Sequence, residues 1–153
     1  MIKFIAAIDN KRGLANDKRI PWDLPTDRKY YHDKITHQTT LVGKGTYHEA
    51  PDRHNIVASR EGVDLAPGDE LVDDAGAYLN TLDDSKDIWV IGGAQIFTST
   101  IDQADELYLT LLDADFGCTK FFPEYDKDFE CVENGQQQTE NGISFRFTVW
   151  RRK

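Results

Sequence analysis

The chain has 153 residues, of which 39% are hydrophobic, and this length suits one domain with a buried core. Its formal net charge is -9, so nucleic acids and anionic membranes are unfavourable partners. No apolar run approaches the roughly 20 residues of a membrane-spanning helix, and the chain begins with a strand pattern instead of a secretion signal. We therefore expect one domain of residues 1–153, monomeric and cytoplasmic, without a nucleic-acid or membrane partner.

The first half of the chain alternates short apolar runs with helical patterns. Residues 2–8 are predicted to form a buried strand, and residues 9–24 a long loop of the kind that tends to be functional. Pro25 suits the first turn of a helix, and helical spacing of apolar and aromatic residues continues to Ile35. The other elements predicted in this half are strands at 39–42, 55–58 and 71–72 and a helical turn at 47–50.

The second half ends in a strand pair. Asn141-Gly142 is a strong turn signal between two segments of alternating polarity, 129–137 and 143–150, which predicts an antiparallel hairpin. Because the earlier strands alternate with helices, the sequence predicts an α/β fold with a mostly parallel sheet and an antiparallel edge. The remaining predicted elements are helices at 75–82 and 94–101 and strands at 87–91 and 106–113.

Asp27 is the carboxylate that most needs an explanation. It falls in the first turn of the predicted helix, on a face whose other residues are apolar or aromatic. Burying a lone carboxylate is costly unless a hydrogen-bond donor or a cation pairs with it. A face that tolerates this Asp therefore indicates a donor-bearing ligand or a use for a raised pKa.

Three strand ends carry features that suit an anionic ligand. They are 43–46, Ser59-Arg60 and 92–95, and glycines at two of them allow a close backbone approach to phosphate. Lys44 and Arg60 add positive charge in an otherwise acidic chain. Together they favour a nucleotide-type anion, although neither the G-x-G-x-x-G nor the Walker pattern is present. The two cysteines and four histidines lack metal-ligand spacing, so we expect free thiols and no metal.

The chain resembles the dihydrofolate reductase family along nearly its whole length. The resemblance implies a central eight-stranded, mostly parallel sheet with an antiparallel C-terminal hairpin, flanked by four helices. It also implies NADPH-dependent reduction of 7,8-dihydrofolate to tetrahydrofolate. The stretches that carry it are Ile5-Ala6-Ala7, Ile20 to Asp27, Val42 to Tyr47, Arg53, Ile91 to Phe97, Tyr108-Leu109-Thr110 and Thr119 to Pro123.

The resemblance also implies roles for substrate-site residues. Asp27 would bind the pterin's ring nitrogen and exocyclic amine, Thr110 would hydrogen-bond that carboxylate, and Trp22 would hold an ordered water. Arg53 would take the glutamate α-carboxylate, a task that suits a guanidinium fork. The remaining implied substrate contacts are Ile5, Ala6, Tyr31 and Ile91.

The implied coenzyme site uses the three strand ends and the loop 9–24. Ala7 and Leu14 would contact the nicotinamide, and Ile20 would lie near the tip of a mobile loop. The 2′-phosphate would lie among Lys44, Ser59 and Arg60, which is the physical reason to prefer NADPH over NADH. The other implied coenzyme contacts are Gly43, Gly45, Thr46, Gly92, Gly93, Ala94, Gln95, Ile96 and Phe97.

The chain departs from the family pattern in several places. Arg28 replaces an apolar residue, and two interpretations stay open: a solvated side chain, or one that reaches the substrate's glutamate tail. The segment 47–53 is shorter than its usual counterpart, and Cys118 stands where an acidic residue is common.

Two other functions share some of these features. A pyrimidine reductase of riboflavin synthesis would use the same fold and NADPH, but the 22–27 motif and Arg53 argue against it. A non-catalytic folate- or nucleotide-binding protein is the other alternative, and the presence of both Asp27 and Thr110 argues against that one.

Overall fold

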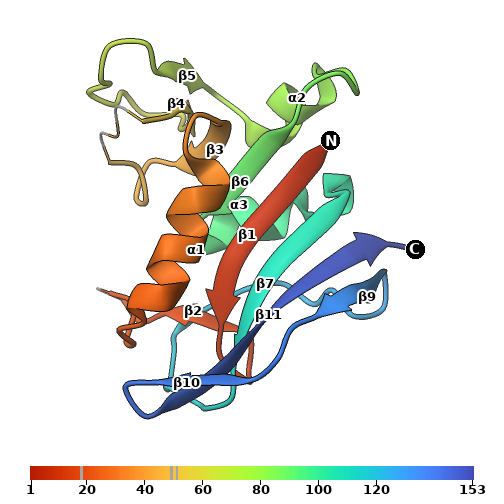
Figure 1. Ribbon diagram of the computed structural model, residues 1–153. Helices are drawn as coiled ribbons and strands as arrows, with labels where there is room; N and C mark the ends of the chain where they lie inside the picture. The colour runs from red at the N-terminus through yellow and green to blue at the C-terminus, as the bar shows by residue number, and fades with distance from the viewer. Residues whose placement is uncertain (18, 49, 51) are drawn as a thin grey trace.

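The computed structural model describes residues 1–17, 19–48, 50 and 52–153, and it is built around one large sheet with helices on both faces (Figure 1). The described residues form three α-helices and one short 3₁₀ helix, together with eleven strands. The helices are α1 Pro25–Ile35, α2 Ala75–Asn80, α3 Ala94–Thr100 and η1 Ile101–Gln103. The strands are β1 Ile2–Ile8, β2 Gly13–Ala15, β3 Thr39–Gly43, β4 His54–Ala58, β5 Glu70–Val72, β6 Ile88–Gly92, β7 Glu106–Leu112, β8 Lys120–Phe121, β9 Phe129–Asn134, β10 Gln138–Glu140 and β11 Ile143–Arg152.

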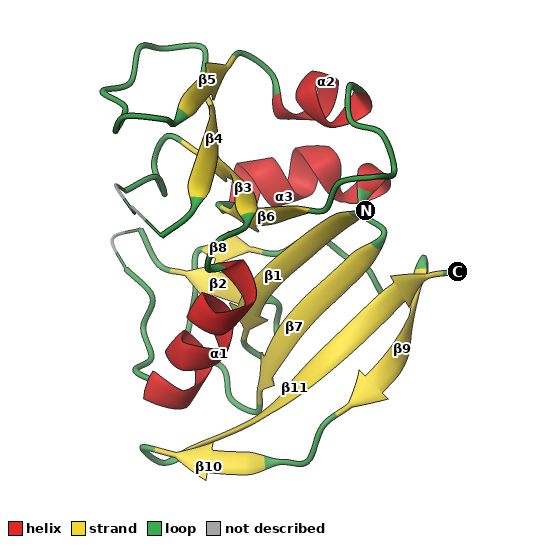
Figure 2. Ribbon diagram, turned by 45° about the horizontal axis from the view of Figure 1, so that its top comes forward, coloured by secondary structure: helices red, strands yellow, loops and turns green. Residues whose placement is uncertain are grey.

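The large sheet has nine strands, in the order β10-β11-β7-β1-β6-β3-β4-β5, with β9 also paired to β11. The strands from β7 to β5 run parallel, whereas β11 is antiparallel to β7, β9 and β10. Central β1 is apolar along most of its length because both of its faces are covered. Phe4 packs in the cluster that includes residues of α2 and α3, and Ile5 packs in the cluster that includes residues of α1. Figure 2 shows α1 on one face of the sheet and α2 and α3 on the other.

The expected eight strands and four helices were wrong in number, because the described residues give nine strands in the sheet and three α-helices. The segment 129–137, predicted as one strand, forms strand β9 only as far as Asn134, and the short strand β10 follows at 138–140; both strands pair with β11. Gly135 follows β9: its N–H donates to Phe147 O at 2.8 Å, and a Cβ there would lie 2.7 Å from that oxygen. A side chain at this position would clash with the backbone of β11, so glycine is required there.

The predicted helical turn at 47–50 was also wrong for its described residues, while Glu49 lies outside them. The N–H groups of Thr46 and Tyr47 both donate to Gly43 O, which closes a tight turn directly after β3. The Tyr47 hydroxyl then donates to Asp69 Oδ2 at 2.7 Å. This long-range hydrogen bond fixes the chain direction after the turn, and local spacing could not reveal it.

The loop 9–24 contains a short strand that the sequence pattern did not predict. Strand β2 pairs antiparallel with β8 in a separate two-stranded sheet. The N–H of Thr119 donates to Ala15 O at 3.0 Å, and the Thr119 hydroxyl donates to Asp17 Oδ1 at 2.7 Å. Two loops far apart in sequence are therefore held together beside the carboxyl ends of β1 and β7.

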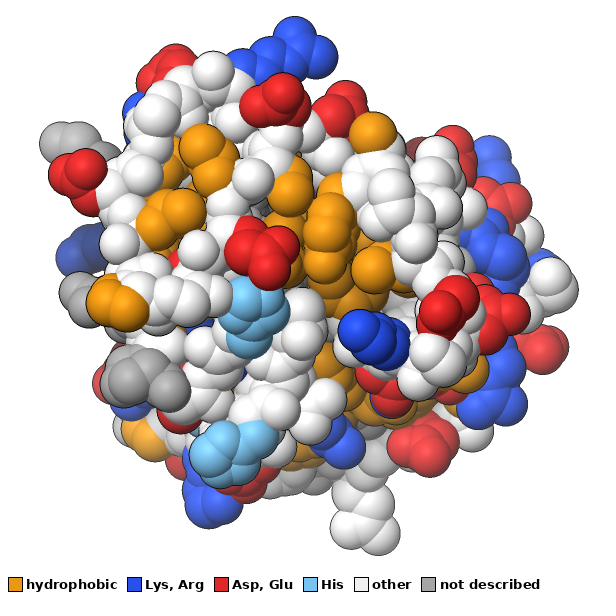
Figure 3. Space-filling model, turned by 90° about the horizontal axis from the view of Figure 1, so that it is seen from above, with side chains coloured by type: hydrophobic (Ala, Val, Ile, Leu, Met, Phe, Trp, Pro, Cys, Tyr) orange, Lys and Arg blue, Asp and Glu red, His pale blue; other side chains and the backbone are white. Residues whose placement is uncertain are grey.

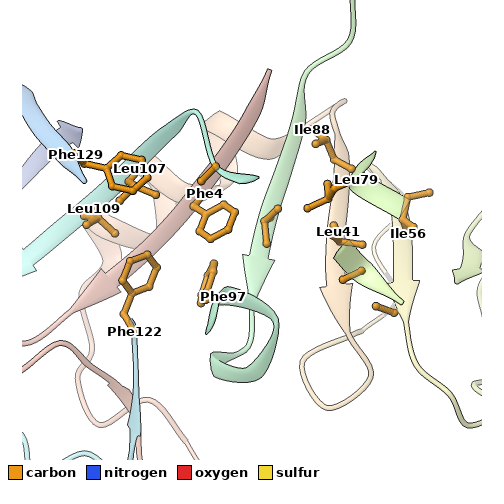
Figure 4. Close-up of a cluster of buried hydrophobic side chains, with 14 of the residues drawn as sticks. Phe4, Leu41, Ile56, Leu79, Ile88, Phe97, Leu107, Leu109, Phe122 and Phe129 are labelled. Carbon is orange, nitrogen blue, oxygen red and sulfur yellow. The ribbon is translucent and has the colours of Figure 1, made fainter. Parts of the chain in front are cut away.

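The main hydrophobic core lies between the sheet and helices α2 and α3 (Figure 4). Phe4, Phe97 and Phe122 form an aromatic group, with ring centroids 5.3 Å apart for Phe4 and Phe97 and 5.0 Å apart for Phe97 and Phe122. Full burial of one such ring contributes about 1.5–3 kcal/mol. This packing fixes the start of α3 against β6, where the glycine pair lies.

The surface carries both signs of charge. On the face shown in Figure 3, acidic and basic side chains are intermingled, with hydrophobic side chains gathered between them. None of the helices within the described part of the chain has the length and apolar character needed to cross a bilayer.

Candidate active site

Asp27 and Thr110 meet in the structure, as the sequence predicts. The Thr110 hydroxyl on β7 donates to Asp27 Oδ1 at 2.6 Å, and Thr110 is buried while Asp27 is half-buried. Burial raises the pKa of Asp27, and the Thr110 hydrogen bond and the Arg28 charge oppose that rise only in part. Among the described residues, Thr110 is the only hydrogen-bond donor to this carboxylate. The site therefore holds a desolvated anion with acceptor capacity to spare.

The start of α1 is held by the C-terminal part of the chain. Leu24 offers no side-chain cap, and Pro25 occupies the first turn, where a missing N–H costs little. Glu140 of β10 accepts from the Thr26 backbone N–H at 3.0 Å and from the Thr26 hydroxyl at 2.6 Å. This carboxylate acts as an external N-cap and places Asp27 over β7.

The predicted apolar walls lie together on the α1 side of the sheet. Ile5 is buried, and the half-buried Tyr31 and Ile91 pack in the same cluster. Ala6 points to the opposite face of β1 and packs against the main core, so only its backbone can face a ligand here. Trp22 packs against Phe116 with the rings tilted and their centroids 5.2 Å apart, close to Leu24 at the helix start.

Arg53 is a buried cation with free donors. Its side chain is 2% exposed, its Nη2 lies 3.3 Å from His48 Nε2, and its Nε lies 3.9 Å from Asp52 Oδ1. Neither Nε nor Nη1 has a hydrogen-bond partner among the described residues. The side chain borders a cavity of about 300 Å³, which His37 and His54 also line. A buried guanidinium with open donors suits a carboxylate ligand.

Arg28 is placed differently from Arg53. Its guanidinium is more than half exposed and forms an ion pair with Asp23, directly before the helix. In this conformation the solvated interpretation of Arg28 matches what is seen, and the substrate-tail interpretation requires Arg28 to leave Asp23.

The two glycine-containing strand ends come together as expected. Strands β3 and β6 are parallel neighbours, with Val42 opposite Gly92. A Cβ on Gly43 would lie 3.0 Å from Ile96 Cγ1, and one on Gly93 would lie 3.0 Å from Thr46 Oγ1. A glycine at each junction thus makes room for a side chain of the other junction, and its bare backbone suits a cradle for a large anion.

The side chains after Gly93 divide between surface and core. Ala94 and Ile96 are half-buried and Gln95 is exposed, so these three lie near the glycine pair with some surface available. Phe97 is 2% exposed and packs on Phe4, so its side chain belongs to the core. Only the backbone of Phe97 can therefore meet a coenzyme.

The residues of the predicted charged cluster follow neighbouring strand ends. Because β3 and β4 are parallel with Gly43 opposite Ala58, Lys44 follows one strand end and Ser59-Arg60 follows its neighbour. Glu61, which no sequence pattern indicated, accepts a hydrogen bond from Lys44 Nζ at 2.6 Å. Gly45 has open space around it, with no heavy atom within 4 Å of a Cβ built there.

The loop residues lie beside these groups. Leu14 is in β2 and packs against the main core, and Ala7 packs in the cluster of Leu24 and Phe145. Ile20 is 59% exposed, so it is available to contact a ligand or to move.

A second buried carboxylate, Asp9, was missed by the sequence analysis. It is 3% exposed and accepts from the backbone N–H groups of Lys11 at 2.9 Å, Gly13 at 2.7 Å and Phe116 at 3.1 Å. Burial acts to raise the pKa of Asp9, but these bonds and one from Cys118 outweigh it and lower the pKa. Its sequence signal is an Asp directly after a buried strand, with a glycine four residues later.

Cys118 lies on the other side of this carboxylate. Burial and the nearby charge of Asp9 raise the pKa of the Cys118 thiol to about 11. A Cβ on Gly13 would lie 2.6 Å from Cys118 Cβ, so this contact depends on glycine. The free thiols expected at both cysteines are confirmed.

Comparisons with known proteins agree with this arrangement. The family model described as dihydrofolate reductase matches residues 1–152. The dihydrofolate reductase of Bacillus subtilis (strain 168) is 29% identical, over 100% of this chain and 95% of that protein. Dihydrofolate reductase type 3 of Salmonella typhimurium is 32% identical, over 82% of this chain and 80% of that protein.

The solved structures include a clear match. Dihydrofolate reductase from Enterococcus faecalis, complexed with NADP(H) and RAB-propyl, superposes with a TM-score of 0.85 at 27% identity. The match covers 100% of this chain and 96% of that one, which confirms the expected reductase-like α/β fold. Since the family model spans nearly all of the chain, this protein belongs to the dihydrofolate reductase family.

Proposed function

We propose that this protein reduces 7,8-dihydrofolate to 5,6,7,8-tetrahydrofolate with NADPH. The observation that carries the proposal is the Asp27–Thr110 pair, a half-buried carboxylate with open acceptor capacity on the side of the sheet that carries the apolar cluster of Ile5, Tyr31 and Ile91. Membership of the dihydrofolate reductase family over residues 1–152 supports it, as does the likeness to a reductase complexed with NADP(H).

The residues present fit an NADPH phosphate chain. Gly43 and Gly93 leave the backbone bare at two neighbouring strand ends, open space surrounds Gly45, and Lys44 and Arg60 add positive charge. When bound, NADPH supplies the hydride for the reduction. Ala7, Leu14 and Ile20 would line the nicotinamide end, and the segment from Gly92 to Phe97 would hold the pyrophosphate region.

Asp27 would hold the pterin by accepting hydrogen bonds from its ring N–H and exocyclic amine. An anion in a site of low dielectric stabilises positive charge that develops on the pterin, and it costs no rearrangement at that moment. Thr110 would keep one carboxylate oxygen oriented, which leaves the other for the ligand. Trp22 would hold an ordered water and exclude the bulk solvent.

Arg53 would bind the carboxylate of the substrate's glutamate tail. Its Nε and Nη1 have no hydrogen-bond partners among the described residues, so the guanidinium keeps donor capacity for a carboxylate ligand. Ile5, Tyr31 and Ile91 would cover the apolar middle of the substrate. Arg28 could add a second contact to the tail only after it separates from Asp23.

The decisive experiment is a spectrophotometric assay with the purified protein. We expect NADPH absorbance to fall when dihydrofolate is added and to stay constant without it. Turnover of a diaminopyrimidine precursor of riboflavin in place of dihydrofolate would support the pyrimidine reductase alternative. Binding of both ligands without any loss of absorbance would instead identify a non-catalytic binding protein. Either result would overturn the proposal.

We further propose that residues 1–153 form a single domain that acts as a monomer in the cytoplasm. The sheet joins strands from both ends of the chain, since β1 and β11 both pair with β7. Light scattering coupled to gel filtration would measure the mass, and 17.5 kDa is the monomer value.

A further inference from the structure

An acidic side chain lies inside the positively charged cluster at the ends of β3 and β4, which are adjacent in the sheet (Figure 1). Lys44 Nζ donates to Glu61 Oε2 at 2.6 Å, and the two side chains are 46% and 78% exposed. The N–H of Glu61 donates to Ser59 Oγ at 3.0 Å, which holds the backbone of Glu61 against the end of β4. The cluster thus contains two cations and one anion.

We propose that Glu61 is a coenzyme-specificity residue that weakens the preference for NADPH over NADH and lets NADH serve as a second hydride donor. This inference rests on the proposed function, because it places the adenosine ribose beside Lys44, Ser59 and Arg60. The two coenzymes differ only by a phosphate on the ribose 2′ oxygen, so groups that face this oxygen decide between them.

Glu61 acts against the phosphate in two ways. Glu61 already forms an ion pair with Lys44, so a 2′-phosphate must either share Lys44 with Glu61 or displace Glu61 from it. Its carboxylate lies 2.6 Å from Lys44 Nζ, so a 2′-phosphate that binds Lys44 would meet a negative charge at short range, where the repulsion is only partly screened. The hydrogen bond from Lys44 lowers the pKa of Glu61, so the carboxylate stays ionised at neutral pH.

Glu61 has the opposite effect on NADH. Where NADPH has a phosphate, NADH has a 2′-hydroxyl, which can donate a hydrogen bond to a carboxylate. An acidic side chain at the ribose hydroxyl is the general solution for binding NAD, whereas a cation near it accommodates the 2′-phosphate. This chain has both kinds of group, so its discrimination is expected to be modest.

The test compares Glu61→Gln with the parent enzyme by equilibrium titration with NADP⁺ and NAD⁺, followed by tryptophan fluorescence. We expect NADP⁺ to bind about 3- to 10-fold more tightly to the variant, the size of one unit charge partly screened at short range. NAD⁺ should bind equally or more weakly. The ratio of kcat/KM for NADPH to that for NADH should rise by a similar factor.

The control is Asp33→Asn, which removes one exposed carboxylate paired with a lysine at the same 2.6 Å distance, in helix α1. It should leave both titrations unchanged. The variant Lys44→Gln should weaken NADP⁺ binding, and adding Glu61→Gln to it should restore less affinity than Glu61→Gln gains alone, because the two side chains are coupled. Added salt should reduce the effect of Glu61→Gln.

An unchanged ratio of NADP⁺ to NAD⁺ affinity in Glu61→Gln would overturn this inference, even if the parent reduces dihydrofolate rapidly with NADPH. An equal rise in the Asp33→Asn control would overturn it too, because the effect would then come from net charge alone. Absence of dihydrofolate reduction by the parent with either coenzyme would overturn the proposed function. The titrations with NADP⁺ and NAD⁺ do not depend on dihydrofolate reduction, so they distinguish failure of this inference from failure of the proposed function.

Discussion

Asp9 and Asp27 are both carboxylates withdrawn from bulk water, and their pKa values move in opposite directions. Asp9 accepts three backbone hydrogen bonds and contacts the Cys118 thiol, and its pKa is lowered. Within the described part of the chain, Asp27 accepts one hydrogen bond, from Thr110, and its pKa is raised. Burial acts on both, so the number of donors decides the outcome. Asp9, whose oxygens already accept several hydrogen bonds, holds two loops together. Asp27 keeps free acceptor positions for a ligand.

The largest effect is expected for Asp27→Asn, which removes the charge but keeps the shape. We expect kcat/KM for dihydrofolate to fall by about 10²-fold or more at neutral pH, the usual cost of losing a preorganised charge at a reacting centre. Acidification should restore part of the rate, because a substrate protonated in solution needs less help from the enzyme.

Stability gives the second readout for Asp27→Asn. Relief of a buried charge should leave the variant at least as resistant to urea as the parent, in line with the usual trade-off between stability and activity. Asp33→Asn on the same helix is the matched control, with expected parental activity. Parental turnover by Asp27→Asn at neutral pH would contradict the role assigned to Asp27.

In contrast to Asp27→Asn, which should keep its stability, Asp9→Ala is expected to lose stability. Removing the acceptor leaves buried N–H groups without partners, so we expect the free energy of unfolding to fall by roughly 2–3 kcal/mol. Urea unfolding followed by circular dichroism would measure this loss. Asp83→Ala removes an exposed acceptor of the Ser85 N–H and should unfold at the parental urea concentration. Equal stability of Asp9→Ala and the parent would mean that the Asp9 network does not hold the loops.

As pH falls, the contributions of Asp27 and Asp9 to the free energy of unfolding should change in opposite directions. As pH falls toward the ordinary value of 3.8, the folded state protonates Asp27 before the unfolded chain does, so the Asp27 contribution to stability rises. For Asp9 the unfolded chain takes the proton first, near 3.8, so stability is lost from there down to the lowered folded-state pKa.

Urea unfolding from about pH 6 to about pH 3 would show both trends. The stability advantage of Asp27→Asn over the parent should shrink as pH falls. The disadvantage of Asp9→Asn should shrink only below the ordinary value of 3.8. If the stability differences of both variants from the parent changed with pH in the same way, the contrast between Asp27 and Asp9 would be contradicted.

The smallest effect is expected for Arg28→Leu. Arg28 lowers the pKa of Asp27 through space, so its loss should move the acid limb of the pH–rate profile slightly upward. If Arg28 also reaches the glutamate tail, KM for dihydrofolate should rise while inhibition by trimethoprim, which lacks that tail, stays the same. A KM equal to the parent value would leave Arg28 as a solvated partner of Asp23.

Patterns of local origin were predictable from the sequence. The bounds of β1 and α1 agree with the apolar run 2–8 and the helical spacing from Pro25 to Ile35. The meeting of Asp27 with Thr110 was anticipated through the family resemblance and not through spacing, since 83 positions separate them.

What could not be predicted depends on contacts between distant segments. The break at Gly135 arises from the backbone of Phe147, and the Asp9 network needs the N–H of Phe116, 107 residues away. The core position of the Phe97 side chain depends on Phe4 and Phe122, so a motif alone could not show which face of α3 it occupies. The Lys44–Glu61 pair joins two strand ends and was missed for the same reason.

The cap on α1 has a consequence for truncation. Glu140 holds the helix start that carries Asp27, and β11 links β10 to β7. A chain shortened before residue 138 lacks both the Glu140 carboxylate and the strand next to β7. Such a chain should be inactive although Asp27, Arg53 and Thr110 are all present.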